Sequence, residues 1–131
     1  QAGQGKILNV ASVAAFFPGP LMAVYYATKA YVLSLSESLS EELKGTGVTV
    51  TALCPRPTVT NFQARAGLSH GRLFGIRTMK ADSVARAGYE GLMRGERVVI
   101  PGALNTVQVL LRPLAPLSLL SSAVRKLHES Q

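Results

Sequence analysis

Cysteine and histidine are scarce in this chain, and each scarcity excludes a class of site. Its 131 residues include one cysteine, Cys54, and two histidines, His70 and His128. A single cysteine excludes an internal disulfide framework, so we expect a reducing compartment, the cytoplasm. No Cys-x-x-Cys or Cys-x-x-His cluster is present, so we assign no metal site. We expect both histidines at the surface, since neither has an orienting partner that the sequence identifies.

Long apolar runs and targeting signals are also missing. The leucine-rich tail over 103–127 contains Arg112 and is broken by Pro113 and Pro116, so it does not match a membrane span. A packed helix pair and a membrane-surface helix pair both remain open for this tail. The chain starts Gln-Ala-Gly, with neither methionine nor a signal peptide. We therefore expect that it begins inside a longer protein.

Acidic residues are few, and the excess of positive charge is local. The chain has 14 basic and seven acidic residues, a net charge of +7. Residues 56–80 contain no acid and hold Arg56, Arg65, Arg72, Arg77 and Lys80. This stretch has few aromatic residues for base stacking and no recognition-helix pattern, so we expect no nucleic-acid partner. An anionic small molecule and a solvated basic loop remain open as explanations.

What is present is an alternation of strand and helix patterns. Short apolar or β-branched runs predict strands over 6–11, 48–53 and 97–100. A helix is predicted over 21–44, where apolar residues recur at three- and four-residue spacing (Val32, Leu35, Leu39 and Leu43) and Val24, Ala27 and Tyr31 form a second apolar face.

A second helix is predicted over 83–94, with Asp82 as its N-cap and Gly95 just after its end. Residues 58–80 show no firm periodicity and are typical of a long functional loop. Strands that alternate with helices predict an α/β fold with a parallel sheet, followed by a helical tail over 103–131. One edge and one face of this small sheet lack partners in the predicted elements.

Polar side chains follow two of the predicted strands at their carboxyl ends. Ser12 comes just after the first strand, and Thr58 and Thr60 follow the second. Tyr25 and Lys29 lie four residues apart on the long helix and therefore share a face. A nearby ammonium stabilises a phenolate, which suits a tyrosine to proton transfer. In open parallel sheets the carboxyl ends of the strands border the ligand crevice.

Together these motifs resemble the short-chain dehydrogenase/reductase family. The matching stretches are Gly5–Ser12, Tyr25–Ala30 and Cys54–Thr60, and the thirteen-residue gap from Ser12 to Tyr25 is the family's usual spacing. The likeness extends over about 5–102, and it is greatest to the bacterial subgroup with a Cys-Pro-Gly-Pro-Thr-x-Thr turn. It implies the C-terminal part of a Rossmann-like, doubly wound parallel sheet with three α/β/α layers.

The resemblance also implies an activity: NAD(P)-dependent interconversion of a carbonyl and an alcohol. Tyr25 would be the general acid/base, and Lys29 would stabilise its phenolate and hold the nicotinamide ribose. Ser12 would bind the substrate carbonyl. The turn from Pro55, with Thr58 through its backbone and Thr60 through its hydroxyl, would hold the nicotinamide carboxamide. NADP is slightly preferred over NAD, because the 56–80 stretch is basic.

Two departures from the family pattern are visible. Arg56 stands where the family usually has glycine, and the glycine-rich phosphate turn is absent. The resemblance thus implies the C-terminal catalytic half of one domain, 1–131, with a substrate loop over 61–80 and a homo-oligomer contact through 21–44. As an isolated chain it is expected to be inactive. The alternative is a non-catalytic fragment or interaction protein that pairs through its exposed sheet edge and long helix.

Overall fold

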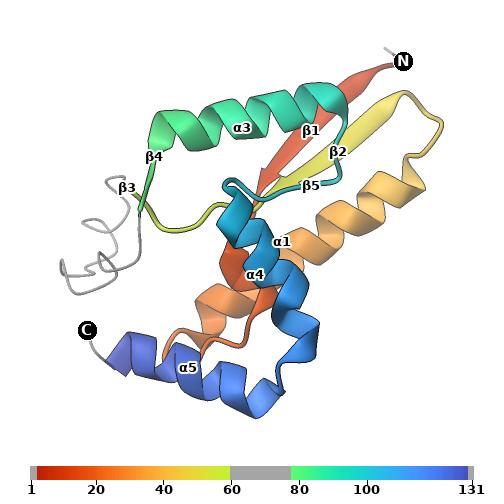
Figure 1. Cartoon of the computed structure of the whole chain (residues 1–131). Coiled ribbons are helices and arrows are strands. Elements are labelled where there is room, and N and C mark those ends of the chain that lie inside the picture. The colour runs from red at the N-terminus through yellow and green to blue at the C-terminus, as the bar shows by residue number, and fades with distance from the viewer. Residues whose placement is uncertain (1–2, 60–77, 130–131) are drawn as a thin grey trace.

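The computed structural model describes residues 3–59 and 78–129, and its centre is a three-stranded parallel sheet (Figure 1). The strands are β1 (Gly5–Val10), β2 (Val48–Leu53) and β5 (Val98–Val99), in the spatial order β1-β2-β5. Residues 5–10 of β1 pair in register with residues 48–53 of β2. The parallel sheet and its three strands were predicted from the sequence, and each lies within one or two residues of its expected bounds.

Alternation along the strands gives the sheet two buried faces. Ala52 and Cys54 point into one core with Leu33 of helix α1 (Ala23–Glu42). Leu53 points the other way, into a core with Val84 of helix α3 (Ala81–Arg94). Successive strand residues face opposite sides, so one helix covers each face. The predicted three-layer α/β/α arrangement is confirmed.

The two connections between strands have opposite hands. Each step, from β1 to β2 and from β2 to β5, moves in the same direction across the sheet and joins parallel strands. Helix α1 lies on one face and α3 on the other (Figure 1). One crossover must therefore be left-handed, although parallel crossovers are almost always right-handed.

Helix α3 begins earlier than the sequence predicted. Its N-cap is Lys80 in extended conformation, without a side-chain bond to the helix backbone, so the expected cap at Asp82 is wrong. Asp82 lies in the first turn instead, where its negative charge interacts favourably with the positive end of the helix dipole. The predicted stop is confirmed: Gly95 ends the helix with a φ of 70°.

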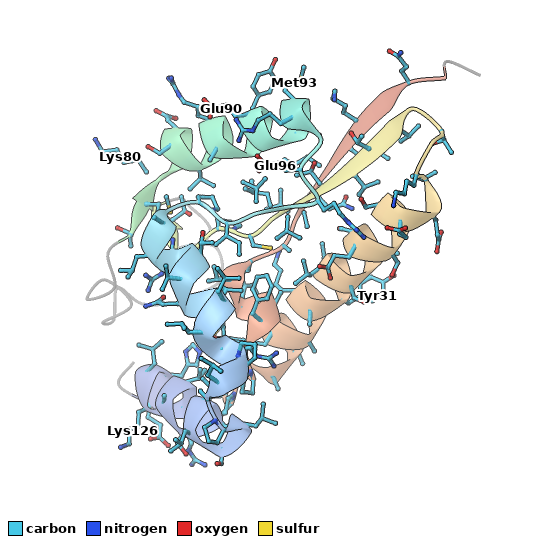
Figure 2. All side chains as sticks on the ribbon, turned by 45° about the vertical axis from the view of Figure 1, so that its right-hand side comes forward. Tyr31, Lys80, Glu90, Met93, Glu96 and Lys126 are labelled. Carbon is cyan, nitrogen blue, oxygen red and sulfur yellow. The ribbon has the colours of Figure 1, made fainter. Side chains whose placement is uncertain are left out.

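Several apolar side chains of α1 are exposed. Leu33 and Ser36 are the buried residues of the helix, and Leu35, a member of the predicted apolar stripe, is 39% exposed. The second apolar face is exposed in the chain, with Val24 at 78% and Tyr31 at 66%. Figure 2 shows Tyr31 on the outer side of α1.

Two further helices follow the carboxyl end of β5 (Figure 1). They are α4 (Ala103–Leu111) and α5 (Leu117–Glu129), joined by a short 3-10 turn, η3 (Arg112–Leu114), with a proline in its first positions. The tail is thus helical, as predicted. Within 3–59 and 78–129, no helix combines the length and hydrophobicity needed to cross a bilayer.

A second, two-stranded sheet lies inside the stretch predicted to be a loop. Strand β3 (Thr58–Val59) pairs in parallel with β4 (Met79–Lys80). Most of the predicted substrate loop, 61–80, lies outside the described residues.

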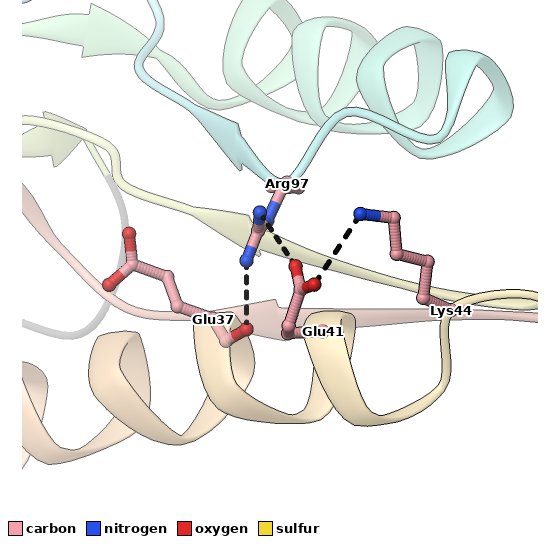
Figure 3. Close-up of polar contacts among 4 residues, drawn as sticks. All are labelled: Glu37, Glu41, Lys44 and Arg97. Carbon is pink, nitrogen blue, oxygen red and sulfur yellow. Dashed lines mark hydrogen bonds and ion pairs between the residues drawn. The ribbon is translucent and has the colours of Figure 1, made fainter.

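Polar contacts also join β5 to α1 at the amino end of the strand. Arg97 donates to Glu37 O at 3.3 Å and pairs with the Glu41 carboxylate at 3.2 Å, which also accepts from Lys44 (Figure 3). All three paired side chains are more than half exposed, so this cluster adds little stability.

Candidate active site at the carboxyl ends of the strands

Ser12 lies at the carboxyl end of β1, where it starts the 3-10 helix η1 (Val13–Phe16). Its Oγ accepts from the Ala14 N–H at 3.1 Å, and the side chain is 8% exposed. The hydroxyl also faces Pro55 O at 3.5 Å, a long distance for an O–H donor. The bond to Pro55 O is therefore the weaker of the two.

Tyr25 and Lys29 are held at the same strand end. The Lys29 ammonium donates to Val10 O, the last residue of β1, at 3.1 Å. The same nitrogen lies 5.8 Å from the centre of the Tyr25 ring. The bond to Val10 therefore places one turn of α1 beside the residues that lead into Ser12. Ser12, Tyr25 and Lys29 thus lie at one rim of the sheet, the carboxyl end of β1.

The turn after β2 reaches this rim from the other side. Pro55 O accepts from the Val13 N–H at 3.1 Å, which ties the turn to η1. Thr58 donates through Oγ1 to Arg56 O at 2.8 Å, so its hydroxyl is turned back onto its own turn. The predicted residue Thr60 lies outside the described part of the chain.

Arg56 does not extend over the turn. Its Nη1 donates to Asn105 Oδ1 of α4 at 2.9 Å. The arginine is therefore held by a partner that sequence spacing gave no means to identify.

His128 is buried, so its predicted surface position is wrong. It is 9% exposed, and its Nε2 lies 3.1 Å from the Tyr26 hydroxyl. The two rings meet edge to face at 5.8 Å, and Tyr26 meets Tyr25 in the same way at 6.0 Å. Burial lowers the pKa of His128; burial and, secondly, the neighbouring Tyr25 raise the pKa of Tyr26. Helix α5 is thus attached to the residue next to Tyr25.

Cys54 lies directly under the rim but is fully buried. Burial raises the pKa of its thiol to about 11. A neutral, inaccessible thiol packs as a small apolar residue and does not serve as a nucleophile. In the part of the chain that the structure describes, no three His, Cys, Asp or Glu side chains cluster as a metal site would need.

Comparison with known proteins connects this rim to one family. The sequence model of the short chain dehydrogenases matches residues 1–70. An uncharacterized oxidoreductase of Staphylococcus epidermidis is 35% identical over 111 residues, covering 84% of this chain and 43% of that protein.

Solved structures agree with the sequence matches. A short-chain dehydrogenase from Sphingobium yanoikuyae, in complex with NADPH, is 34% identical to this chain and superposes with a TM-score of 0.70. The match covers 87% of this chain and 46% of that one. A bulky-bulky ketone specific alcohol dehydrogenase from Comamonas testosteroni is 32% identical with a TM-score of 0.61, and the match covers 86% of this chain and 42% of that one. The chain therefore spans less than half the length of these relatives. Because the family's sequence model matches more than half of the residues of this chain, the chain belongs to the short-chain dehydrogenase family.

Proposed function

We propose that this chain carries the catalytic half of an NAD(P)-dependent oxidoreductase that interconverts a carbonyl and an alcohol. One observation carries the proposal: the Lys29 ammonium is bonded to Val10 O, which holds Tyr25 and Lys29 beside the strand end that leads into Ser12. A phenol, an ammonium and a hydroxyl at the carboxyl rim of a parallel sheet suit proton transfer to a bound carbonyl.

Tyr25 is the proposed general acid/base. In the reduction direction its hydroxyl gives a proton to the carbonyl oxygen, and in oxidation its phenolate takes a proton from the alcohol. The Lys29 ammonium lies 5.8 Å from the ring centre and stabilises the phenolate by charge. Its bond to Val10 O keeps this charge at a fixed place, so little reorganisation accompanies the proton transfer.

Ser12 is the proposed substrate-positioning residue. Its Oγ already accepts from the Ala14 N–H, so the oxygen is fixed while the O–H proton is held only by the long contact to Pro55 O. That proton can turn to a substrate carbonyl oxygen and orient it for Tyr25. The same carbonyl oxygen would then receive a hydrogen bond from each of the two hydroxyls.

The rim fits the nicotinamide end of a dinucleotide. Lys29 offers a cation at the end of β1, and the turn from Pro55 to Thr58 is tied to the same end through the bond from the Val13 N–H to Pro55 O. Bound there, the nicotinamide would supply the hydride, and Lys29, Pro55, Thr58 and Thr60 would hold it. We propose that NADP is slightly preferred over NAD.

The alternative function is that of a non-catalytic interaction protein. Among the described residues β1 pairs with β2 alone, and Ile7 and Val10 on β1 are 44% and 54% exposed. An unpaired apolar edge of this kind accepts a further strand. The two functions differ in whether the chain needs a nucleotide to act.

We further propose that the full-length protein is a homo-oligomer that uses α1. The exposed face of this helix carries Val24 and Tyr31, which are 78% and 66% exposed in the single chain. A second copy of the helix would remove both side chains from water, which favours association.

The test of the catalytic proposal is turnover by the complete protein. NADPH or NADH oxidation is followed with a panel of aldehydes, ketones and 3-oxoacyl esters, in the wild type and in Lys29→Met. We expect turnover with at least one carbonyl in the wild type and a loss of about 10²-fold or more in the variant. Lys44→Met, in an exposed lysine at the other end of the helix, is the matched control. Equal rates in Lys29→Met and Lys44→Met would contradict the proposal.

A further inference from the structure

Arg56 occupies a turn position where the family usually has glycine, and its side chain extends to helix α4. Nη1 donates to Asn105 Oδ1 at 2.9 Å. Asn105 lies in the first turn of α4 and is 6% exposed. A long cation from the turn after β2 is therefore bonded to a buried amide on the first helix after β5.

The Asn105 amide is held on its other side as well. Its Nδ2 donates to Pro101 O and contacts Met79 Sδ at 3.8 Å. Gly102 precedes it with a φ of 90°, and a Cβ there would lie 3.0 Å from Nδ2. The backbone before α4 thus leaves just enough room for this side chain, and the amide has one orientation that satisfies both its donor and its acceptor.

These contacts close a ring around the turn. From Arg56 the ring passes through Asn105 to the Met79 side chain, and the Met79 N–H donates to Pro57 O at 3.2 Å. Pro57 is the neighbour of Arg56, so the ring returns to its start. Thr58 lies inside it, with its hydroxyl on Arg56 O at 2.8 Å.

We propose that Arg56 is a positioning residue, whose bond to Asn105 fixes the turn that carries Thr58 against helix α4. A glycine at this position would leave only the indirect link through Met79, whereas the arginine bonds the turn directly to α4. The proposal rests on the proposed function for the part that Thr58 plays toward the nicotinamide. The link between Arg56 and Asn105 itself does not depend on catalysis.

The link is tested by a double-mutant cycle in the complete protein, with thermal unfolding as the readout. Arg56→Met keeps the length of the side chain and removes its donors. We expect it to lower the unfolding midpoint by about 2–4 °C, and to have no effect once Asn105→Ala is present. Arg97→Met is the matched control, because Arg97 bonds α1 at the other end of the sheet. Its effect should add to that of Asn105→Ala. Additive effects of the substitutions at 56 and 105 would overturn the proposal.

The positioning role is tested by steady-state kinetics on the same variants. We expect Arg56→Met to raise KM for the nucleotide about fivefold or more, with kcat within twofold and an unchanged pH profile. Arg56→Lys keeps a charged donor facing Asn105 Oδ1 and leaves the amide's bond to Pro101 O intact, so it should keep KM within twofold of wild type. An unchanged nucleotide KM in Arg56→Met overturns the positioning role even if the two residues are coupled in unfolding. If the proposed function is wrong, the wild type will show no turnover. The double-mutant cycle in thermal unfolding still tests the link between Arg56 and Asn105 in that case.

Discussion

The contact between Tyr26 and His128 makes a prediction that connects stability, pH and the C-terminal helix. The Tyr26 hydroxyl lies 3.1 Å from His128 Nε2, and His128 is 9% exposed. The lowered pKa of His128 and the raised pKa of Tyr26 leave both groups neutral at pH 7, so they share one hydrogen bond whose donor is set by the histidine tautomer. Tyr26→Phe removes this hydrogen bond and keeps the aromatic ring.

The expected cost follows from burial. Leaving a buried polar atom without its partner costs about 1–3 kcal/mol, which is more than the net contribution of an average hydrogen bond. We therefore expect Tyr26→Phe to lower the free energy of unfolding by about 1–3 kcal/mol in chemical denaturation at pH 7.5. Tyr89→Phe is the matched control: Tyr89 is 63% exposed on α3, and a change within about 0.5 kcal/mol is expected.

The pH dependence has a definite sign. Because the folded pKa of His128 lies below its usual value of 6.5, the unfolded chain binds a proton first as the pH falls. The contribution of the neutral histidine is complete above about pH 7 and is lost as the pH falls through 6.5 toward the folded value. His128→Phe should therefore flatten the stability of the protein between about pH 7 and 5. An unchanged slope in His128→Phe, or an unchanged stability in Tyr26→Phe, would refute this reasoning.

Three further predictions follow from other parts of the fold. Gly91→Ala should destabilise the protein by about 1–2 kcal/mol in urea unfolding, because the new Cβ would lie 2.2 Å from Val99 Cγ2. This cost exceeds the gain from the better helix propensity of alanine. A gain in stability would show that α3 does not pack so closely. The 131-residue chain should bind NADPH and NADH weakly or not at all in isothermal titration, since it contains no glycine-rich phosphate turn, and a micromolar dissociation constant would be evidence against this expectation. Val24→Asp in the complete protein should shift sedimentation from oligomer to monomer, and an unaltered sedimentation coefficient would exclude α1 as the interface.

The fold could be predicted from the sequence because its signals are local. The β-branched run at 48–53 and the glycine at 95 act through neighbours in the chain, and both produced the expected elements. Helix α3 was predicted with the wrong start because Asp82 has the chemistry of a cap, while the backbone enters the helix two residues earlier. Spacing identified the apolar stripe that contains Leu35, but the buried residues of the helix are Leu33 and Ser36.

Contacts between distant parts of the chain could not be predicted. His128 meets Tyr26 across 102 residues, and Arg56 meets Asn105 across 49. No period or motif encodes such pairs, so the burial of His128 and the direction of Arg56 emerged only from the folded chain. The candidate site lies between these cases. Tyr25 and Lys29 share a helix turn by spacing, but the bond from Lys29 to Val10 O depends on how α1 crosses the sheet.

The proton-transfer role of Tyr25 is the central claim, and one measurement tests it most directly. The rate of carbonyl reduction by the complete protein is compared between Tyr25→Phe and Tyr31→Phe, two substitutions that each remove one hydroxyl from α1. We predict a loss of about 10²–10⁴-fold in kcat/KM for Tyr25→Phe and a rate close to wild type for Tyr31→Phe. A Tyr25→Phe protein that reduces the carbonyl at close to the wild-type rate would contradict the assignment.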